Sequence, residues 1–399
     1  MPFGRGWIYF ISLSAQAENY TIYIILRYLS GVKESIDMND LLHEFLEITA
    51  YGVPSKHESE IRRCLKEKLT ALGFEVSEDD AFPETGSGNL YGFLPGEGEP
   101  ILFACHMDTV TPCENKKVIV EESGLIHTDG TTILGADDVS GIVELLAAVR
   151  RVIAEKVSHR PIEVVFTASE EYFVEGAKKL DYSRLRSKQA YILDTDGEIG
   201  RAVYAAPTGV RIIAEITGRA AHAALKPEAG INAIAIASEA VSEMRLGRID
   251  ADTTANIGII RGGSSGNIVP ECCFVEGETR SLCHEAAMAQ KAHMEECFRG
   301  AAERHGGKCR IESSIVYNAW AISEEHPLCL RFGEACERVG LTPNFERACG
   351  GSDASFLAAH GIDCLILATG MHEIHSVREY TTLEEMTAMT EVVYHLITL

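Results

Sequence analysis

The chain has 399 residues, of which 46% are hydrophobic and 24% charged, as expected for a globular protein of two or three domains. Its net charge of -23 argues against nucleic-acid partners and anionic membranes, because both attract basic surfaces. The 12 cysteines are scattered and form no CxxC pair, so we expect reduced thiols in a cytoplasmic protein rather than disulfides.

The first 37 residues do not follow the pattern of the rest of the chain. The stretch GWIYFISLSAQA follows Arg5 and ends in small residues at Ala15 and Ala17, so it is weakly similar to a secretory signal. A second apolar stretch follows at once, and neither is long enough to span a bilayer. An amphipathic helix is predicted from Met38, and we interpret residues 1–37 as an N-terminal extension or a mis-assigned start.

The next segments alternate between helical and strand-like patterns. Residues 54–74 predict a helix with a capping box at Ser55 and Glu58 and an end at Gly73. Residues 137–156 predict a second helix, and apolar strands are predicted in GNLYGFL, PILFAC, PIEVVFTA and AYILD. Apolar strands separated by helices indicate a parallel sheet that is covered on both faces.

The pattern changes after Pro207. Segments with strand and helix signals follow in the order β-α-β-β-α-β, which is typical of a ferredoxin-like unit. Later segments, from about Gly350, again suit the first domain, so this α+β unit is predicted to be an insertion in an α/β domain.

Three predicted strand ends carry groups that could bind a metal. His106 and Asp108 lie two residues apart and would project from the same face of a strand, as a ligand and its orienting carboxylate do. Glu170 and Glu171 follow another strand, and Asp194 ends a third. Ligands collect at the carboxyl ends of such strands. Each feature also has a simpler interpretation, because solvated acidic loops and strand-end histidines are common.

The stretch TTILGADDVSG places Asp137 and Asp138 before a helix. Helix capping accounts for one aspartate at such a position. Two adjacent aspartates are explained better by cation binding. In the same way, one member of the Glu170–Glu171 pair could hold a metal while the other carries protons.

The motifs HMD, GADD, SEE, LDTDG, GRAAHA, GGSSGNIVPE, GETRS, GGSDAS and HEIHS occur in an order that resembles the M20 family of di-metal peptidases. The similarity is greatest to its peptidase T (aminotripeptidase)-like branch and runs from about Met38 to the C-terminus. The resemblance implies a zinc-peptidase-like α/β/α catalytic domain, residues 38–207 and 317–399, with an inserted ferredoxin-like lid, residues 208–316, through which a homodimer forms.

The resemblance also implies a set of ligands for two divalent metal ions. His106, Asp137 and Asp194 would hold one ion, and Asp137, Glu171 and His375 the other, with Asp137 as the bridge. The family has a cis peptide bond between the paired aspartates. Nitrogen and oxygen ligands without thiolate suit Zn²⁺, and also Mn²⁺ or Co²⁺.

The implied reaction is hydrolysis of a peptide bond in a short peptide by a hydroxide that bridges the two ions. Glu170 would be the general base, and Asp108 would orient His106. His222 would stabilise the oxyanion from the lid, and Asn267 and Arg280 would hold the substrate. Gly351, Ser352 and Asp353 resemble a loop that faces the substrate in this family.

Three features depart from or refine the motif. Val139 stands where the family has lysine, and we consider Arg378 a replacement for that charge. His372 is expected to stack or line the pocket rather than bind metal. Asp194, rather than glutamate, favours an aminopeptidase. The alternatives left open are an M20-type carboxypeptidase or N-acyl amino acid deacylase, and an inactive peptide-binding protein.

Overall fold

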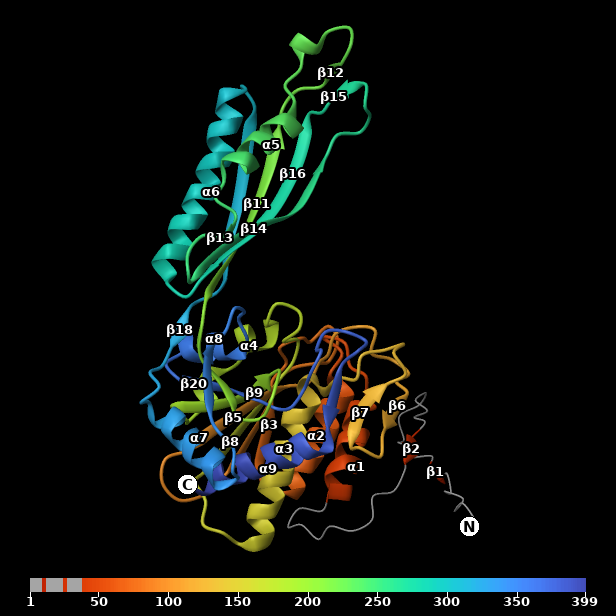
Figure 1. Ribbon diagram of the computed structural model, residues 1–399, viewed down its shortest axis with the longest axis vertical. Helices are drawn as coiled ribbons and strands as arrows, with labels where there is room; N and C mark the ends of the chain where they lie inside the picture. The colour runs from red at the N-terminus through yellow and green to blue at the C-terminus, as the bar shows by residue number, and fades with distance from the viewer. Residues whose placement is uncertain (1–8, 12–23, 27–37) are drawn as a thin grey trace, which may run out of the picture. The chain divides into compact units, whose positions relative to one another are not determined.

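The computed structural model describes residues 9–11, 24–26 and 38–399 (Figure 1). The chain divides into two compact units. The first runs to Tyr204 and includes Ile322–Glu346 and Ser352–Leu399, and the second comprises Ala205–Ala321 and Arg347–Gly351. Most of the predicted N-terminal extension, including most of its signal-like stretch, lies outside the described residues.

The first unit is built on a mixed sheet. Its strand order is β10-β20-β9-β5-β8-β4-β3, and β19 pairs with β10. The strands are β3 (Glu75–Glu78), β4 (Leu90–Leu94), β5 (Ile101–His106), β8 (Ile162–Thr167), β9 (Gln189–Thr195), β10 (Arg201–Ala206), β19 (Asn344–Arg347) and β20 (Asp363–Ala368). The short strand β18 (Trp320–Ala321) falls within the second unit.

The predicted parallel pairing is correct only for the centre of this sheet. Strands β20, β9, β5 and β8 are parallel, whereas β4 runs antiparallel to β8 and β10 antiparallel to β20. The apolar pattern that predicted these strands reports burial on both faces, and burial does not fix strand direction. The centre nevertheless gathers four carboxyl ends at one edge.

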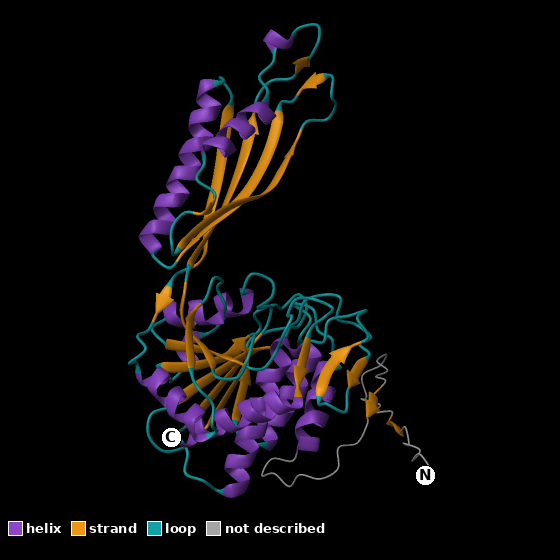
Figure 2. Ribbon diagram, in the orientation of Figure 1, coloured by secondary structure: helices purple, strands orange, loops and turns teal. Residues whose placement is uncertain are grey.

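Helices pack on either side of this sheet (Figure 2). The predicted helix at residues 137–156 is the largely buried α3, which contacts β5, β9 and the C-terminal helix α9. The helices of the unit are α1 (Met38–Thr49), α2 (Ser59–Ala71), α3 (Ala136–Glu155), α4 (Glu175–Lys179), α7 (Pro327–Arg338), α8 (Asp353–Ala359) and α9 (Leu383–Thr398), with a 3-10 turn at Tyr182–Arg184.

The predicted capping box of α2 is wrong, although Gly73 does end the helix, with φ of +88°. The helix begins at Ser59 without a side-chain cap. The Ser55 hydroxyl donates to Asp108 Oδ2 at 2.6 Å, and Glu58 accepts the Ser169 N–H at 2.9 Å. Contacts with residues far along the chain therefore take both side chains away from the local role.

A second, smaller sheet lies in the same unit, with the order β1-β2-β6-β7-β21. Strand β21 pairs antiparallel with β7, which places the segment after His375 beside residues 125–128. The strands are β1 (Tyr9–Ile11), β2 (Ile24–Leu26), β6 (Val118–Val120), β7 (Leu125–Thr128) and β21 (Tyr380–Thr382).

The second unit has the predicted β-α-β-β-α-β order. Its sheet is antiparallel, in the order β13-β14-β16-β11-β17, and every other residue of β16 is buried. Its elements are β11 (Thr208–Thr217), β12 (Ala221–His222), a 3-10 turn (Pro227–Ala229), α5 (Ala233–Glu243), β13 (Gly247–Arg248), β14 (Thr253–Gly262), β15 (Ile268–Val269), β16 (Cys272–Ser281), α6 (His284–Arg304) and β17 (Lys308–Tyr317). Residues of α5 and α6 complete its apolar core.

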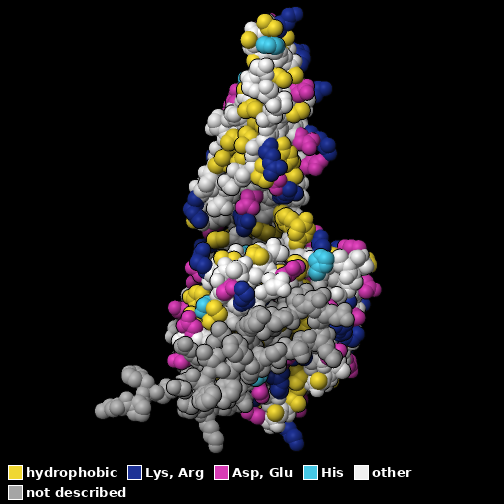
Figure 3. Space-filling view, turned by 90° about the vertical axis from the view of Figure 1, so that its right-hand side faces the viewer, with side chains coloured by type: hydrophobic (Ala, Val, Ile, Leu, Met, Phe, Trp, Pro, Cys, Tyr) yellow, Lys and Arg dark blue, Asp and Glu magenta, His cyan; other side chains and the backbone are white. Residues whose placement is uncertain are grey.

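Among the described residues on the face in Figure 3, basic side chains lie between acidic and apolar ones and form no continuous basic patch. In the described part of the chain, no helix combines the length and the apolar character needed to cross a membrane.

Candidate metal centre

The carboxyl ends of the parallel strands place the predicted ligands together. His106 is the last residue of β5, Glu170 and Glu171 follow β8, and Asp194 lies near the end of β9. His375 belongs to the loop between β20 and β21. This is the edge at which open α/β sheets bind their ligands.

Asp137 lies between two histidines. Its Oδ1 is 2.9 Å from His106 Nε2, and its Oδ2 is 3.2 Å from His375 Nε2. His375 Nε2 is also 3.0 Å from Glu171 Oε2, and Asp194 Oδ1 is 3.8 Å from His106 Nε2. The Asp137–Asp138 peptide bond is cis, as the resemblance implied. Each oxygen of Asp137 thus faces a different histidine, as a carboxylate between two cations does.

The donor set fits divalent cations. His106, Asp137 and Glu171 offer ligand atoms within 4.8 Å of one another, and so do His106, Asp138 and Asp194. The Oε1 atom of Glu171 is buried and has no hydrogen-bond partner in the protein. All donors are nitrogen or oxygen, which suits Zn²⁺, Mn²⁺ or Co²⁺.

Asp138 is not in the ligand set that the family resemblance implied, but it lies in the second of these groups. Its Oδ2 accepts the His106 backbone N–H at 3.0 Å, and its Oδ1 is buried without a partner. Asp138 therefore also holds the end of β5 in place.

The acidic residues of the centre lie close together, and they favour the positively charged forms of the neighbouring histidines. Burial lowers the pKa of His106, but contacts with Asp108 and Asp137 outweigh it and raise that pKa well above its usual value. Hydrogen bonds to Asp137 and Glu171 raise the pKa of His375 to about 11. Neutral histidine is the metal-binding form, so cations would replace these protons.

Glu170 and Asp194 show the same crowding. Burial and the neighbouring carboxylate of Asp194 raise the pKa of Glu170 well above its usual range. Burial likewise raises the pKa of Asp194, and Asp137 and Asp138 add to the shift. A carboxylate in such surroundings holds a proton readily, which is what a general base must do.

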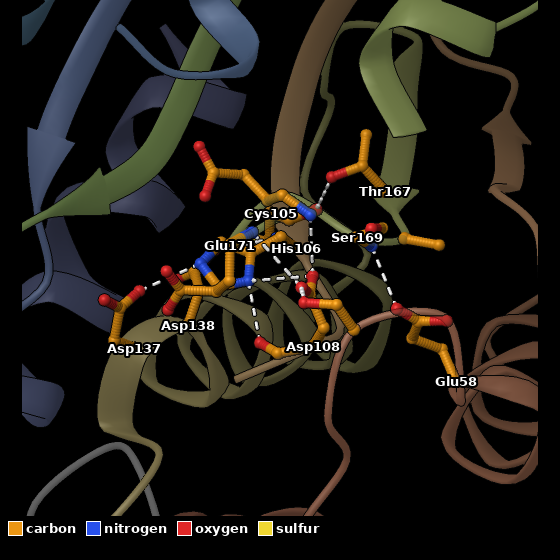
Figure 4. A network of polar contacts seen from close by, with 12 residues as sticks. Glu58, Cys105, His106, Asp108, Asp137, Asp138, Thr167, Ser169 and Glu171 are labelled. Atoms are coloured by element: carbon orange, nitrogen blue, oxygen red, sulfur yellow. Dashed lines mark hydrogen bonds and ion pairs between the residues drawn. The ribbon is translucent and has the colours of Figure 1, made fainter. Parts of the chain in front are cut away.

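Asp108 lies beside His106, on the side that was predicted, and it makes further contacts that were not predicted. The nearest partner of His106 Nδ1 is the Asp108 carbonyl oxygen, at 2.8 Å, while the Asp108 carboxylate lies 3.5 Å away. The carboxylate also accepts the N–H group of Glu170, at 2.9 Å. It accepts the N–H group of Glu171 as well, at 3.2 Å (Figure 4). Both the backbone and the carboxylate of Asp108 therefore lie beside the histidine, and the carboxylate also holds the two glutamate N–H groups.

Glu58 was missed as a site residue because it was interpreted as a helix cap. It is fully buried and accepts the Ser169 N–H, immediately before Glu170 (Figure 4). Burial and the nearby charge of Asp108 raise its pKa. The role of Glu58 in holding the turn before Glu170 follows from its position in the folded chain. The sequence around Glu58 does not predict that position.

Ser352 and Asp353, which were predicted to face the substrate, lie at the start of α8 and make contacts within the protein. The Ser352 hydroxyl accepts the Ala354 N–H at 3.3 Å and caps α8. Asp353 is 2% exposed, and its Oδ2 accepts a hydrogen bond from Thr167 Oγ1 at 2.5 Å. Burial raises the pKa of Asp353 to about 6.

Comparison with known proteins identifies the family. Residues 208–306 match the peptidase dimerisation domain of M20 proteins, and residues 89–252 match peptidase family M28. The aminopeptidase PepT from Bacillus cereus is 40% identical, with a TM-score of 0.87, and the match covers 91% of this chain and 98% of that one. The chain belongs to the M20 peptidases.

Other relatives agree. YqjE of Bacillus subtilis is 40% identical over 361 residues, which is 90% of this M20 peptidase and 97% of YqjE. A tripeptidase from Staphylococcus aureus is 36% identical, with a TM-score of 0.89 and coverage of 92% and 99%. Peptidase T of Escherichia coli K12 is 26% identical, covering 89% of this chain and 97% of that protein.

Three predicted substrate residues of this M20 peptidase lie in its second unit. His222 and Asn267 are neighbours, because β12 pairs with β15 and the Ala223 N–H donates to the Asn267 carbonyl at 3.0 Å. Arg280 binds both carboxylate oxygens of Glu278, each at 3.0 Å. Their roles in substrate binding stay predictions.

Arg378 does not supply the charge that Val139 lacks. Its side chain is 74% exposed and forms an ion pair with Glu373 Oε2 at 2.9 Å, so its charge is paired at the surface. Val139 is buried in the main apolar cluster. His372 stacks on Tyr380 with ring centroids 4.7 Å apart, which agrees with the predicted stacking.

Proposed function

We propose that this M20 peptidase removes the N-terminal residue from short peptides, tripeptides in particular, and depends on two divalent metal ions. The observation that carries the proposal is the position of Asp137 between His106 and His375, beside the Glu170–Glu171 turn. Overall similarity to an aminopeptidase and a tripeptidase supports the substrate class.

The ions would be zinc, with manganese or cobalt as substitutes. His106, Asp137 and Asp194 would hold one, and Asp137, Glu171 and His375 the other. When bound, the ions polarise a peptide carbonyl and increase the acidity of water.

Glu170 would act as the general base. Its N–H is fixed by Asp108, and its buried carboxylate lies among other acids, so proton affinity is high. It would take the proton from the attacking water and deliver it to the nitrogen of the leaving peptide. This transfer leaves Glu170 ionised for the next cycle.

Arg280, His222 and Asn267 would contact the substrate. The Arg280 guanidinium binds the Glu278 carboxylate in a bidentate manner. The C-terminal carboxylate of a tripeptide would bind Arg280 in the same manner, in place of Glu278. The match of residues 208–306 to a dimerisation domain supports a homodimer, and we propose a cytoplasmic location on composition.

The competing function is cleavage of N-acyl amino acids or of the C-terminal residue. The overall similarity to an aminopeptidase and a tripeptidase does not favour it. An inactive binding protein is disfavoured because Glu170 and the full ligand set are present.

The test compares a free tripeptide with its N-acetylated form, using Zn²⁺- or Mn²⁺-loaded protein. Release of the N-terminal residue from the free peptide alone, lost by orders of magnitude in Glu170→Ala, is the expected result. Glu175→Gln is a matched control, because Glu175 begins α4, five residues after Glu170, and pairs with Lys56. Cleavage of the blocked peptide would assign the deacylase or carboxypeptidase function.

A further inference from the structure

The turn that carries Asp137 has unusual backbone geometry. Gly135, the N-cap of α3, has φ of +79°, and Asp137 and Asp138 depart from helical angles. A glycine offers no side chain to cap the first N–H groups of a helix. The hydrogen bonds that hold this turn must therefore come from elsewhere in the chain.

Glu379 provides them from a segment 244 residues away. Its Oε2 accepts the Gly135 N–H at 2.7 Å, and its Oε1 accepts the Asp137 N–H at 3.0 Å. The side chain is 2% exposed, so water does not compete for these bonds. A carboxylate at a helix N-terminus is also favoured by the helix dipole.

Lys116 holds the other side of the same turn. Its ammonium donates to the Leu134 carbonyl at 2.9 Å and to Thr49 Oγ1 at 3.3 Å. A Cβ atom added to Gly135 would lie 2.5 Å from Lys116 Nζ, so the ammonium packs directly against this glycine. Burial lowers the pKa of Lys116 to about 8, and the group is therefore still mostly charged at pH 7.

These contacts connect two ligand segments. Glu379 lies four residues after His375, and Asp137 follows Gly135 by two. The bonds from Glu379 therefore fix the His375 loop relative to the Asp137 turn, and Lys116 keeps the turn from moving away on its opposite side. The 2.9 and 3.2 Å contacts of Asp137 with the two histidines depend on that relation.

We propose that Glu379 and Lys116 are positioning residues that clamp the Leu134–Asp137 turn, and thereby set the affinity of the protein for its divalent metal ions. The proposal rests on the proposed function only in taking Asp137 as a ligand. Groups that orient a ligand from behind contribute about 10- to 100-fold in metal affinity.

The experiment measures Zn²⁺ binding to chelator-stripped, full-length protein, by titration against a fluorescent chelator, together with the melting temperature of each stripped variant. Glu379→Gln keeps the shape but exchanges one acceptor oxygen for an NH₂ group, so one backbone N–H loses its partner. We expect a 10- to 100-fold weaker affinity. Lys116→Met removes the donor to Leu134 and should weaken binding in the same direction.

Matched controls lie nearby in the sequence. Lys117 is adjacent to Lys116, is 55% exposed and pairs with Asp129, and Glu384 is exposed. Lys117→Met and Glu384→Gln should bind Zn²⁺ as the wild type does. If Lys116→Met does not fold, Glu379→Gln decides the question alone.

The proposal is overturned if Glu379→Gln binds Zn²⁺ within threefold of its control, even when its melting temperature falls, because the role would then be structural only. Wild-type affinity in Asp137→Asn would overturn the ligand assignment and this proposal with it. Weakened affinity in the clamp variants, in a protein that cleaves no peptide, would support the clamp and contradict only the proposed function.

Discussion

Asp108→Asn tests whether a side chain that binds neither metal nor substrate controls the reaction through the Glu170–Glu171 turn. The wild-type carboxylate is 1% exposed and accepts three hydrogen bonds, from the two glutamate N–H groups and from Ser55. An asparagine amide has one acceptor oxygen in place of two. The Ser55 hydroxyl can rotate to accept from the NH₂ group, but a backbone N–H cannot.

One glutamate N–H is thus left without a partner whichever way the amide is turned. An unsatisfied buried donor costs about 2–3 kcal/mol when its partner was charged. At 1.36 kcal/mol for each factor of ten, kcat/KM should fall by about 30- to 160-fold if the turn must keep its position during the reaction. The fall should be mainly in kcat, because the residues expected to hold substrate are unchanged.

The assay is steady-state tripeptide hydrolysis with saturating metal, combined with urea unfolding of the stripped protein. Asp129→Asn is the control, because Asp129 also accepts an N–H and a hydroxyl bond from Thr131, but on an exposed turn. Its kcat/KM should remain within twofold of the wild type. A value for Asp108→Asn within threefold of the wild type, in a folded and metal-loaded protein, would refute the reasoning.

Three further predictions follow from the packing and charge. Stripping the metal should lower the melting temperature, because an ion at about 1,000 times its Kd stabilises the folded state by about 4 kcal/mol; equal calorimetric transitions for loaded and stripped protein would contradict this. Gly141→Ala should destabilise the protein by about 1–3 kcal/mol in urea unfolding, because the new Cβ would lie 2.4 Å from the Leu193 carbonyl and 2.6 Å from Asp138 Oδ1. Burial raises the pKa of Glu295, but its hydrogen bonds outweigh burial and lower that pKa from 4.5 to about 2. The ionised side chain should therefore stabilise the protein by about 1–3 kcal/mol above pH 4.5, and this contribution should be lost as the pH falls toward 2. Glu295→Gln should remove this part of the acid dependence of the melting temperature, and an unchanged pH profile would count against it.

The proposed ligand residues have local signals in the sequence, and the structure brings them together. His106 ends a strand, Asp137 lies at the start of a helix, and Glu170 and Glu171 follow a strand, and hydrophobic periodicity identifies each of these elements. Parallel strands then bring such ends to one edge of the sheet. The same logic predicted the β-α-β-β-α-β order of the second unit, because each strand and helix has its own apolar pattern.

The residues behind the ligands could not be predicted in this way. Glu58 was interpreted as a cap of the next helix, yet it holds Ser169, which lies 111 residues away. Arg378 was interpreted as a replacement charge, yet it pairs at the surface with Glu373. Composition and spacing show that a charge exists but not which way its side chain turns.

The sequence by itself therefore determined the elements, the chemistry of the donors and their edge of the sheet, because these depend on periodicity and on residue type. Only the tertiary structure decided the directions of β4 and β10, the hydrogen bonds from the Glu170 and Glu171 N–H groups to Asp108, and the clamp of Glu379 and Lys116. These features join residues from distant parts of the chain, and their energy comes from burial, which strengthens each polar contact by excluding water.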